Sequence, residues 1–123
     1  MTGSEYQQQA MRTNDGKSLE RLILAAATNK EDIGGILEAA FGLVGEVGEL
    51  VDMIKKWIFH ERPLNVEHAK RELGDALWYA AMICHCFGWD MDEIMQINID
   101  KLKVRFPDGF TPEAANNRAA GDL

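Results

Sequence analysis

Apolar residues recur along most of this chain at intervals of three and four positions, which is the period of an amphipathic α-helix. The clearest runs extend from Ile36 to about Phe59 and from Asn65 to about Phe87. No stretch shows the sustained alternation of apolar and polar residues that marks a half-buried β-strand. The pattern therefore predicts an all-α protein with two long helices.

Polar and glycine residues indicate where the helices end. Ser4 and Gln7 resemble a capping box that opens a short first helix. Asn65 is a suitable N-cap for the second long helix, and Gly88 suits its C-terminal end. Residues 29–35 are expected to connect two helices, although the last three of them could already be helical. The expected helices cover residues 4–12, 18–28, 36–59, 65–87 and 90–105.

The length of 123 residues indicates a single domain, for which we predict the bounds 1–110, followed by a polar tail over 111–123. A hydrophobic content of 46% with 27% charged residues is typical of a globular chain rather than a disordered one. Small domains bury a modest share of their surface, so a helical bundle of this size would gain from an oligomer interface.

The formal net charge of -7 argues against a nucleic-acid polymer as partner, because no basic stripe is present to neutralise its phosphates. The charge does not exclude a nucleotide, since a bound metal would reverse the local field. No apolar run approaches the roughly 20 residues needed to span a membrane, so no membrane partner is expected. The N-terminus lacks a basic segment followed by an apolar stretch, and the predicted location is the cytoplasm. Cys84 and Cys86 are too few for a disulfide framework.

Two carboxylate pairs lie on the long helices, Glu46 with Glu49 and Glu72 with Asp75. Each pair has i, i+3 spacing, so both side chains project from one helix face about one turn apart. The pairs lie at nearly the same angle beside the apolar stripes of their helices. Helices that share a core would therefore aim all four carboxylates at a common space. Two such charges about 4 Å apart repel by about 4 kcal/mol at an effective dielectric near 20, and a cation would relieve that repulsion.

Carboxylate oxygens suit a hard cation, so the predicted metal is Mg²⁺, with Mn²⁺ as a substitute. The competing interpretation is an ordinary solvated helix face, which is favoured for either pair alone. A surface ladder of ion pairs would place lysines four positions after these acids, where the chain instead has Leu50, Met53, Ala76 and Tyr79. A zinc site has no support, because the histidines show no ligand spacing with the cysteines, and a ferritin-like di-iron site lacks any Glu-x-x-His.

Asn98, Lys101 and Arg105 occupy one face of the last predicted helix and could bind phosphate oxygens. The alternative is a solvated face near a helix C-terminus, where cations suit the helix dipole. Lys55 and Lys56 follow the first acidic pair by about two turns and could also reach phosphate. Combined with a four-carboxylate metal site, these cations predict a pocket for a polyphosphate.

Two aromatic residues could contact a base or sugar. Tyr79 lies one turn after Asp75 on the carboxylate side of its helix, and Trp57 lies at the edge that carries Glu46 and Glu49. Packing in the core is the alternative for both side chains, and for Trp57 it is the favoured one.

The segments GLVGEVGEL, DMIKKW, ELGDALWY and NIDKLKVRFPDGF, taken in this order, resemble the MazG-like all-α nucleoside triphosphate pyrophosphohydrolase superfamily over about Phe41 to Phe110. The resemblance implies a four-helix-bundle-like fold, usually a homodimer or a dimer of dimers. It also implies cleavage of nucleotides between the α and β phosphates. One departure is Gly45, where many members have a glutamate before Glu46.

The resemblance also implies roles for individual residues. The metal ligands would be Glu46, Glu49, Glu72 and Asp75. The phosphate contacts would be Asn98, Lys101 and Arg105.

The sequence therefore predicts a Mg²⁺-dependent hydrolase that converts a nucleoside or deoxynucleoside triphosphate to the monophosphate and pyrophosphate. Glu46 or Glu49 would accept the proton of the attacking water. The first alternative is a non-catalytic helical dimer that binds nucleotide or metal as a sensor or interaction module. The second is a helix-bundle interaction protein with no ligand.

Overall fold

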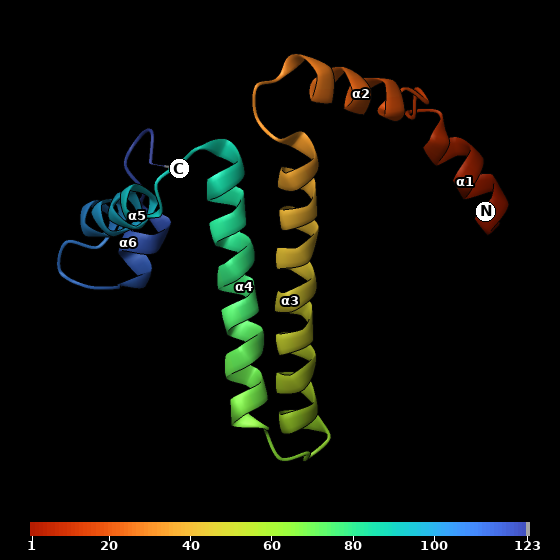
Figure 1. Cartoon of the computed structure of the whole chain (residues 1–123). Coiled ribbons are helices and arrows are strands. Elements are labelled where there is room, and N and C mark those ends of the chain that lie inside the picture. The colour runs from red at the N-terminus through yellow and green to blue at the C-terminus, as the bar shows by residue number, and fades with distance from the viewer. Residues whose placement is uncertain (123) are drawn as a thin grey trace.

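The computed structural model describes residues 1–122, which form helices and turns and contain no strand (Figure 1). The expected all-α class is confirmed. The helices are α1 (Gly3–Met11), α2 (Ser18–Thr28), α3 (Ile33–Phe59), α4 (Val66–Phe87), α5 (Met91–Arg105) and α6 (Pro112–Asn116).

The centre of the fold is an antiparallel pair made by α3 and α4, which lie side by side along their length (Figure 1). The buried apolar side chains within residues 1–122 are few and small, namely Ala39, Ala76 and Cys84. Helices α1 and α2 extend away from the start of α3, whereas α5 and α6 lie together on the other side of α4 (Figure 1). The α3–α4 pair is therefore the scaffold on which a site can be built.

The ends of α4 follow the local signals in the sequence. The side chain of Asn65 accepts a hydrogen bond of 3.0 Å from the backbone N–H of His68. Gly88 has a φ of 71°, in the left-handed region, and the N–H of Trp89 donates to the carbonyl of Cys84 at 2.9 Å. Both expected caps are confirmed, because each depends on residues only a few positions apart.

One predicted cap was wrong, and one helix start that the sequence left open lies at the earlier position. The capping box of α1 is formed by Thr2 and Glu5, not by Ser4 and Gln7. The Glu5 carboxylate accepts from the N–H of Thr2 at 2.6 Å, and a charged acceptor forms a stronger bond than a glutamine amide. Helix α3 begins at Ile33, so the last three residues of the expected connection are already helical, because the Asp32 side chain accepts from the N–H of Gly35 at 3.0 Å.

The segment expected as a polar tail has local structure. It contains the short helix α6, and the carboxylate of Asp122 accepts two hydrogen bonds from the Arg105 guanidinium, at 2.9 and 2.7 Å. The division at residue 110 stays a prediction, and residue 123 of the expected tail lies outside the described residues.

A seam of exposed apolar residues follows α3. Its members are spaced alternately by three and four positions and are Val44, Val47, Val51, Ile54 and Ile58, with between 43% and 72% of each residue exposed. This spacing is the one by which helices pack against each other in bundles. Each of these residues therefore keeps more than two fifths of its surface exposed within residues 1–122.

Two further absences concern the same described residues. None of the helices within residues 1–122 combines the length and the apolar content needed to cross a membrane. Cys84 and Cys86 are both free thiols, the first buried and the second half-buried. No disulfide was expected at this spacing.

The turn after α3 carries backbone strain. Glu61 has a φ of 52°, a left-handed conformation that glycine adopts readily and other residues adopt at a cost. Replacing Glu61 with glycine should therefore raise the free energy of unfolding by about 0.5–1 kcal/mol. Denaturant unfolding measures this change, and Gly88→Ala is the reciprocal control, which should lose a similar amount. A Glu61→Gly protein no more stable than the parent would contradict the expectation.

Candidate metal centre

Acidic side chains from α3 and α4 meet in the middle of the helix pair. Glu46 of α3 and Glu72 and Asp75 of α4 each offer a carboxylate oxygen, and these oxygens all lie within 4.8 Å of one another. The i, i+3 spacing on α4 places its two acids on one face, and the antiparallel contact with α3 brings Glu46 against them. The group therefore offers three oxygen ligands in a space of metal-site size.

Two oxygens of this group are buried without a hydrogen-bond donor within residues 1–122, the Oε2 atoms of Glu46 and Glu72. The other oxygen of Glu72 lies 2.8 Å from Nε2 of His68. Buried acceptors without a donor are rare in proteins because they lose their hydration without compensation. A cation would satisfy both atoms, and an all-oxygen donor set fits a hard cation such as Mg²⁺.

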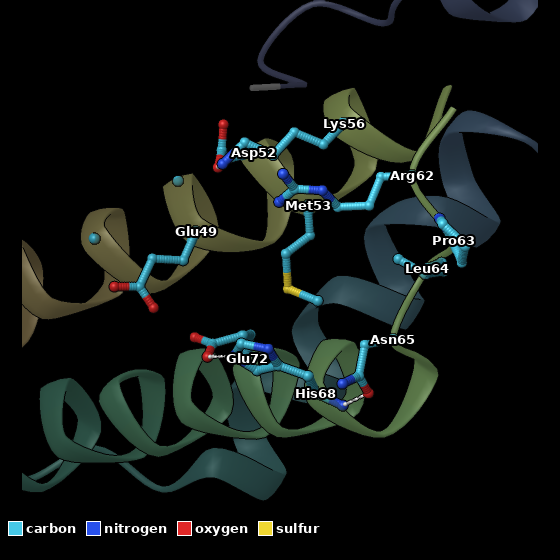
Figure 2. A pocket seen from close by; sticks show the side chains of 12 residues that line it. Glu49, Asp52, Met53, Lys56, Arg62, Pro63, Leu64, Asn65, His68 and Glu72 are labelled. Carbon is cyan, nitrogen blue, oxygen red and sulfur yellow. Dashed lines mark hydrogen bonds and ion pairs between the residues drawn. The ribbon is translucent and has the colours of Figure 1, made fainter. Parts of the chain in front are cut away.

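Glu49 lies outside this three-acid group but next to it. Its side chain is exposed, and it lines the same cavity as Glu72, facing it from the opposite wall (Figure 2). Three of the four predicted metal residues are thus brought into one cluster, and the fourth stands at its edge.

The mutual repulsion of these acids changes their pKa values. The pKa of Glu46 is raised from 4.5 to about 7, first because its carboxyl group lies against that of Glu72, then by loss of hydration and by the charges of Glu49, Glu72 and Asp75. The pKa of Glu49 is raised as well, mainly by Glu72. The pKa of Glu72 is lowered, mainly because the carboxyl groups of Glu46 and Glu49 lie against it and take up the proton more readily, with a further contribution from His68. Without a cation the cluster therefore retains a proton close to neutral pH.

The metal-free protein should lose stability as the pH rises from about 4.5 to about 7. In this window folded Glu46 holds a proton that the unfolded chain has released, since its pKa is raised from 4.5 to about 7. Folding then takes up a proton, so the free energy of unfolding falls as the pH rises. Carboxylates with lowered pKa values, such as Glu72, change the stability only below this pH window, where they take up protons.

Thermal denaturation in EDTA at a series of pH values measures this dependence. Glu46→Gln is the control, which should flatten the profile. An unfolding temperature that rises between pH 5 and 7 in the parent protein would contradict the expectation.

A cavity of about 740 Å³ extends from the acids toward the turn between the two helices (Figure 2). Gly45 and Gly48 line it on α3, and a Cβ atom at either position would meet nothing within 4 Å. The other lining residues of α3 are Asp52, Met53 and Lys56, besides Glu49. The remaining wall is made by residues 62–65, His68 and Glu72. The glycines thus leave open space beside the acids.

Sequence reasoning did not include Arg62 or His68 in the site. His68 precedes Glu72 by four positions, and residues three or four positions apart share a helix face, so this spacing could have indicated that His68 belongs to the site. Arg62 lies in a turn, where no periodicity relates its side chain to the helices.

Of the other residues predicted on α3 and α4, Lys56 lines the cavity, whereas Lys55, Trp57 and Tyr79 do not. Lys55 pairs with Asp52 at 3.2 Å and is exposed, whereas Lys56 pairs with the same carboxylate at 2.6 Å and does line the cavity. The ring of Tyr79 packs so closely over Gly42 that a Cβ atom there would overlap it. Trp57 is 46% exposed.

The predicted phosphate contacts of α5 are not brought to the acids within one chain. No residue of α5 belongs to the three-acid group or lines the cavity in the part of the chain that the structure describes. Arg105 is instead paired with Asp122. Asn98 and Lys101 are exposed on a helix that lies beyond α4 (Figure 1).

The family is decided by a match to the profile of the MazG nucleotide pyrophosphohydrolase domain, which covers residues 37–110. The chain belongs to this family. The match includes the acids of both long helices as well as α5, and the all-helical structure agrees with the all-α MazG fold. This is a metal-dependent family in general, and the three-acid group is a suitable place for the ion.

Similarity to individual proteins is more distant. The chain is 29% identical over 100 residues to the Gene 37 protein of Mycobacterium phage L5, covering 78% of this chain and 88% of the phage protein. No solved structure matches the chain significantly.

Proposed function

We propose that this MazG-family chain hydrolyses a nucleoside or deoxynucleoside triphosphate between the α and β phosphates in a Mg²⁺-dependent reaction. The products would be the nucleoside monophosphate and pyrophosphate. The observation that carries the proposal is the convergence of Glu46, Glu72 and Asp75, with oxygens within 4.8 Å of one another, in a nucleotide pyrophosphohydrolase domain. The predicted cytoplasmic location would give access to nucleotide substrates.

The ion would be held by Glu46, Glu72 and Asp75, with Glu49 as a further ligand from the edge of the group. When bound, Mg²⁺ would neutralise phosphate charge and activate a water molecule, and Mn²⁺ could substitute for it. The two oxygens of Glu46 and Glu72 without donors support this assignment.

The proton of the attacking water would pass to Glu49 or Glu46. Both have raised pKa values, and a proton acceptor works best when its pKa is near the operating pH. The position of Glu49 favours it, because its exposed carboxylate faces the cavity from outside the three-acid group.

The substrate contacts would require assembly of the protein. We propose a homodimer, or a dimer of dimers, in which the apolar seam of α3 is covered by a second copy of the chain. The seam is exposed and has the spacing of a helix-packing surface. Assembly could also bring Asn98, Lys101 and Arg105 to an acidic cluster that they do not reach within one chain. Lys55 would add a phosphate contact, and Trp57 and Tyr79 would contact base or sugar.

Pyrophosphate release from a panel of triphosphates, with and without Mg²⁺, tests the proposed reaction. The panel contains the common ribo- and deoxyribonucleotides together with damaged ones, and chromatography identifies the products. We expect monophosphate and pyrophosphate only when the metal is present. Formation of diphosphate and orthophosphate would contradict the cleavage position. Binding of nucleotide or metal without any hydrolysis would identify the chain as a sensor module. Absence of both would indicate a helix-bundle interaction protein.

A further inference from the structure

The turn between α3 and α4 closes one end of the cavity, and its backbone is unusual. Glu61 is the single non-glycine residue with a positive φ within residues 1–122, at 52°. This conformation turns the chain back on α3, so that the backbone N–H of Arg62 donates to the carbonyl of Lys56 at 3.2 Å. Strained residues of this kind are often retained at ligand sites, where the strain positions a neighbouring group.

The group positioned here is the Arg62 side chain. It extends from the turn toward α3, and Arg62 lines the cavity together with Met53 and Lys56 of that helix (Figure 2). Within residues 1–122 no carboxylate forms an ion pair with its guanidinium, and no other side chain accepts a hydrogen bond from it. Arg71, on α4, differs in that it pairs with Glu67 at 3.5 Å and does not line the cavity.

The charges along the cavity change from negative to positive. Glu49 and Glu72 lie at one end, while Lys56 and Arg62 lie toward the turn. Along α3, Lys56 follows Glu49 by seven residues, or about 10 Å of helix axis. Lys56 is already paired with Asp52 at 2.6 Å, so the guanidinium is the cation with unused donors. An elongated anion whose other end is held through a metal fits this arrangement.

We propose that Arg62, assisted by Lys56, binds the terminal phosphates of the triphosphate, the half that leaves as pyrophosphate. This inference rests on the proposed function. A guanidinium can bind two phosphate oxygens at once, so the site would orient the chain of phosphates as well as hold it. The monophosphate product, which lacks these phosphates, makes no contact with Arg62. The residue therefore favours triphosphate over monophosphate, and the turn belongs to the substrate site.

The test compares the parent protein with Arg62→Gln. In Mg²⁺, the KM for a triphosphate should rise about 10- to 100-fold, as expected for loss of a hydrogen-bonded charge pair. The kcat should change by less than about threefold, because the reacting phosphorus is held by the acids and the metal. The affinity for inorganic pyrophosphate, measured by calorimetry with Mg²⁺ present, should fall by the same factor as KM rises. The affinity for the nucleoside monophosphate should stay as in the parent.

Arg71→Gln is the matched control, because it makes the same change at an exposed arginine of α4 outside the cavity. It should leave all four quantities unchanged. Arg62→Lys should restore part of the pyrophosphate affinity, since it restores the charge without the two-pronged geometry. Thermal denaturation of each variant confirms that the fold is retained.

Unchanged pyrophosphate affinity in Arg62→Gln would overturn the inference, and so would an equal loss of monophosphate affinity. A parent protein that binds no pyrophosphate in Mg²⁺ would overturn it as well. Failure of the proposed reaction gives a different result. The parent protein would then bind Mg²⁺ and pyrophosphate but release none from a triphosphate, and the loss of affinity in Arg62→Gln would still establish the anion site.

Discussion

Asp75→Asn should abolish hydrolysis, lowering kcat by at least about a thousandfold, because the site loses one of its negatively charged oxygen ligands. Asparagine has nearly the same shape as aspartate, so the packing of α3 on α4 should be retained. The measurements are pyrophosphate release in Mg²⁺ and calorimetric titration with Mg²⁺ alone, which should show weakened binding.

The stability of Asp75→Asn separates a loss of function from a loss of fold. Asp75 is one of the charges that raise the pKa of Glu46, so its removal relieves repulsion in the metal-free protein. The metal-free variant should therefore unfold at a temperature no lower than that of the parent. Glu67→Gln, which removes an exposed carboxylate of α4 that is paired with Arg71 outside the three-acid group, should retain full activity. Hydrolysis at the parent rate in Asp75→Asn would refute the metal assignment.

Val51→Asp should separate the proposed dimer into single chains and remove activity with it. Val51 stands in the middle of the α3 seam and is 57% exposed within one chain, so aspartate there should not disturb the single chain. In an assembly that covers the seam, the same carboxylate would be buried without a partner, which is strongly unfavourable. Light scattering after gel filtration measures the mass, and pyrophosphate release measures the activity.

Gln8→Glu is the control for Val51→Asp. It adds the same negative charge at an exposed position of α1, away from the seam, and should leave both mass and activity unchanged. A Val51→Asp protein that keeps the mass of a dimer would show that the seam is not the interface. A parent protein with the mass of a single chain would contradict the proposed assembly.

The two variants distinguish the parts of the proposal. Asp75→Asn changes the site without changing the interface, whereas Val51→Asp changes the interface without touching an acid. If activity requires both, the substrate contacts are completed by assembly. If Val51→Asp dissociates and remains active, the α3–α4 pair and its cavity are sufficient.

Much of the fold could be predicted from the sequence because its determinants are local. The caps at Asn65 and Gly88 depend on hydrogen bonds that span only a few residues. Local competition also explains the error at the first helix, since the charged side chain of Glu5 provides a stronger cap than Gln7 would. The seam on α3 follows from the helical period, but its exposure does not, because exposure depends on which element packs there.

The sequence by itself determined the five longer helices and which acids share a face of each helix, since both follow from the period of one helix. Only the tertiary structure decided that Glu46 joins Glu72 and Asp75 while Glu49 stands at the edge, because that depends on how α3 packs on α4. It also decided that Arg62 lines the cavity and that α5 lies away from the acids. These positions are set by turns and by contacts between distant residues, for which helical spacing carries no information.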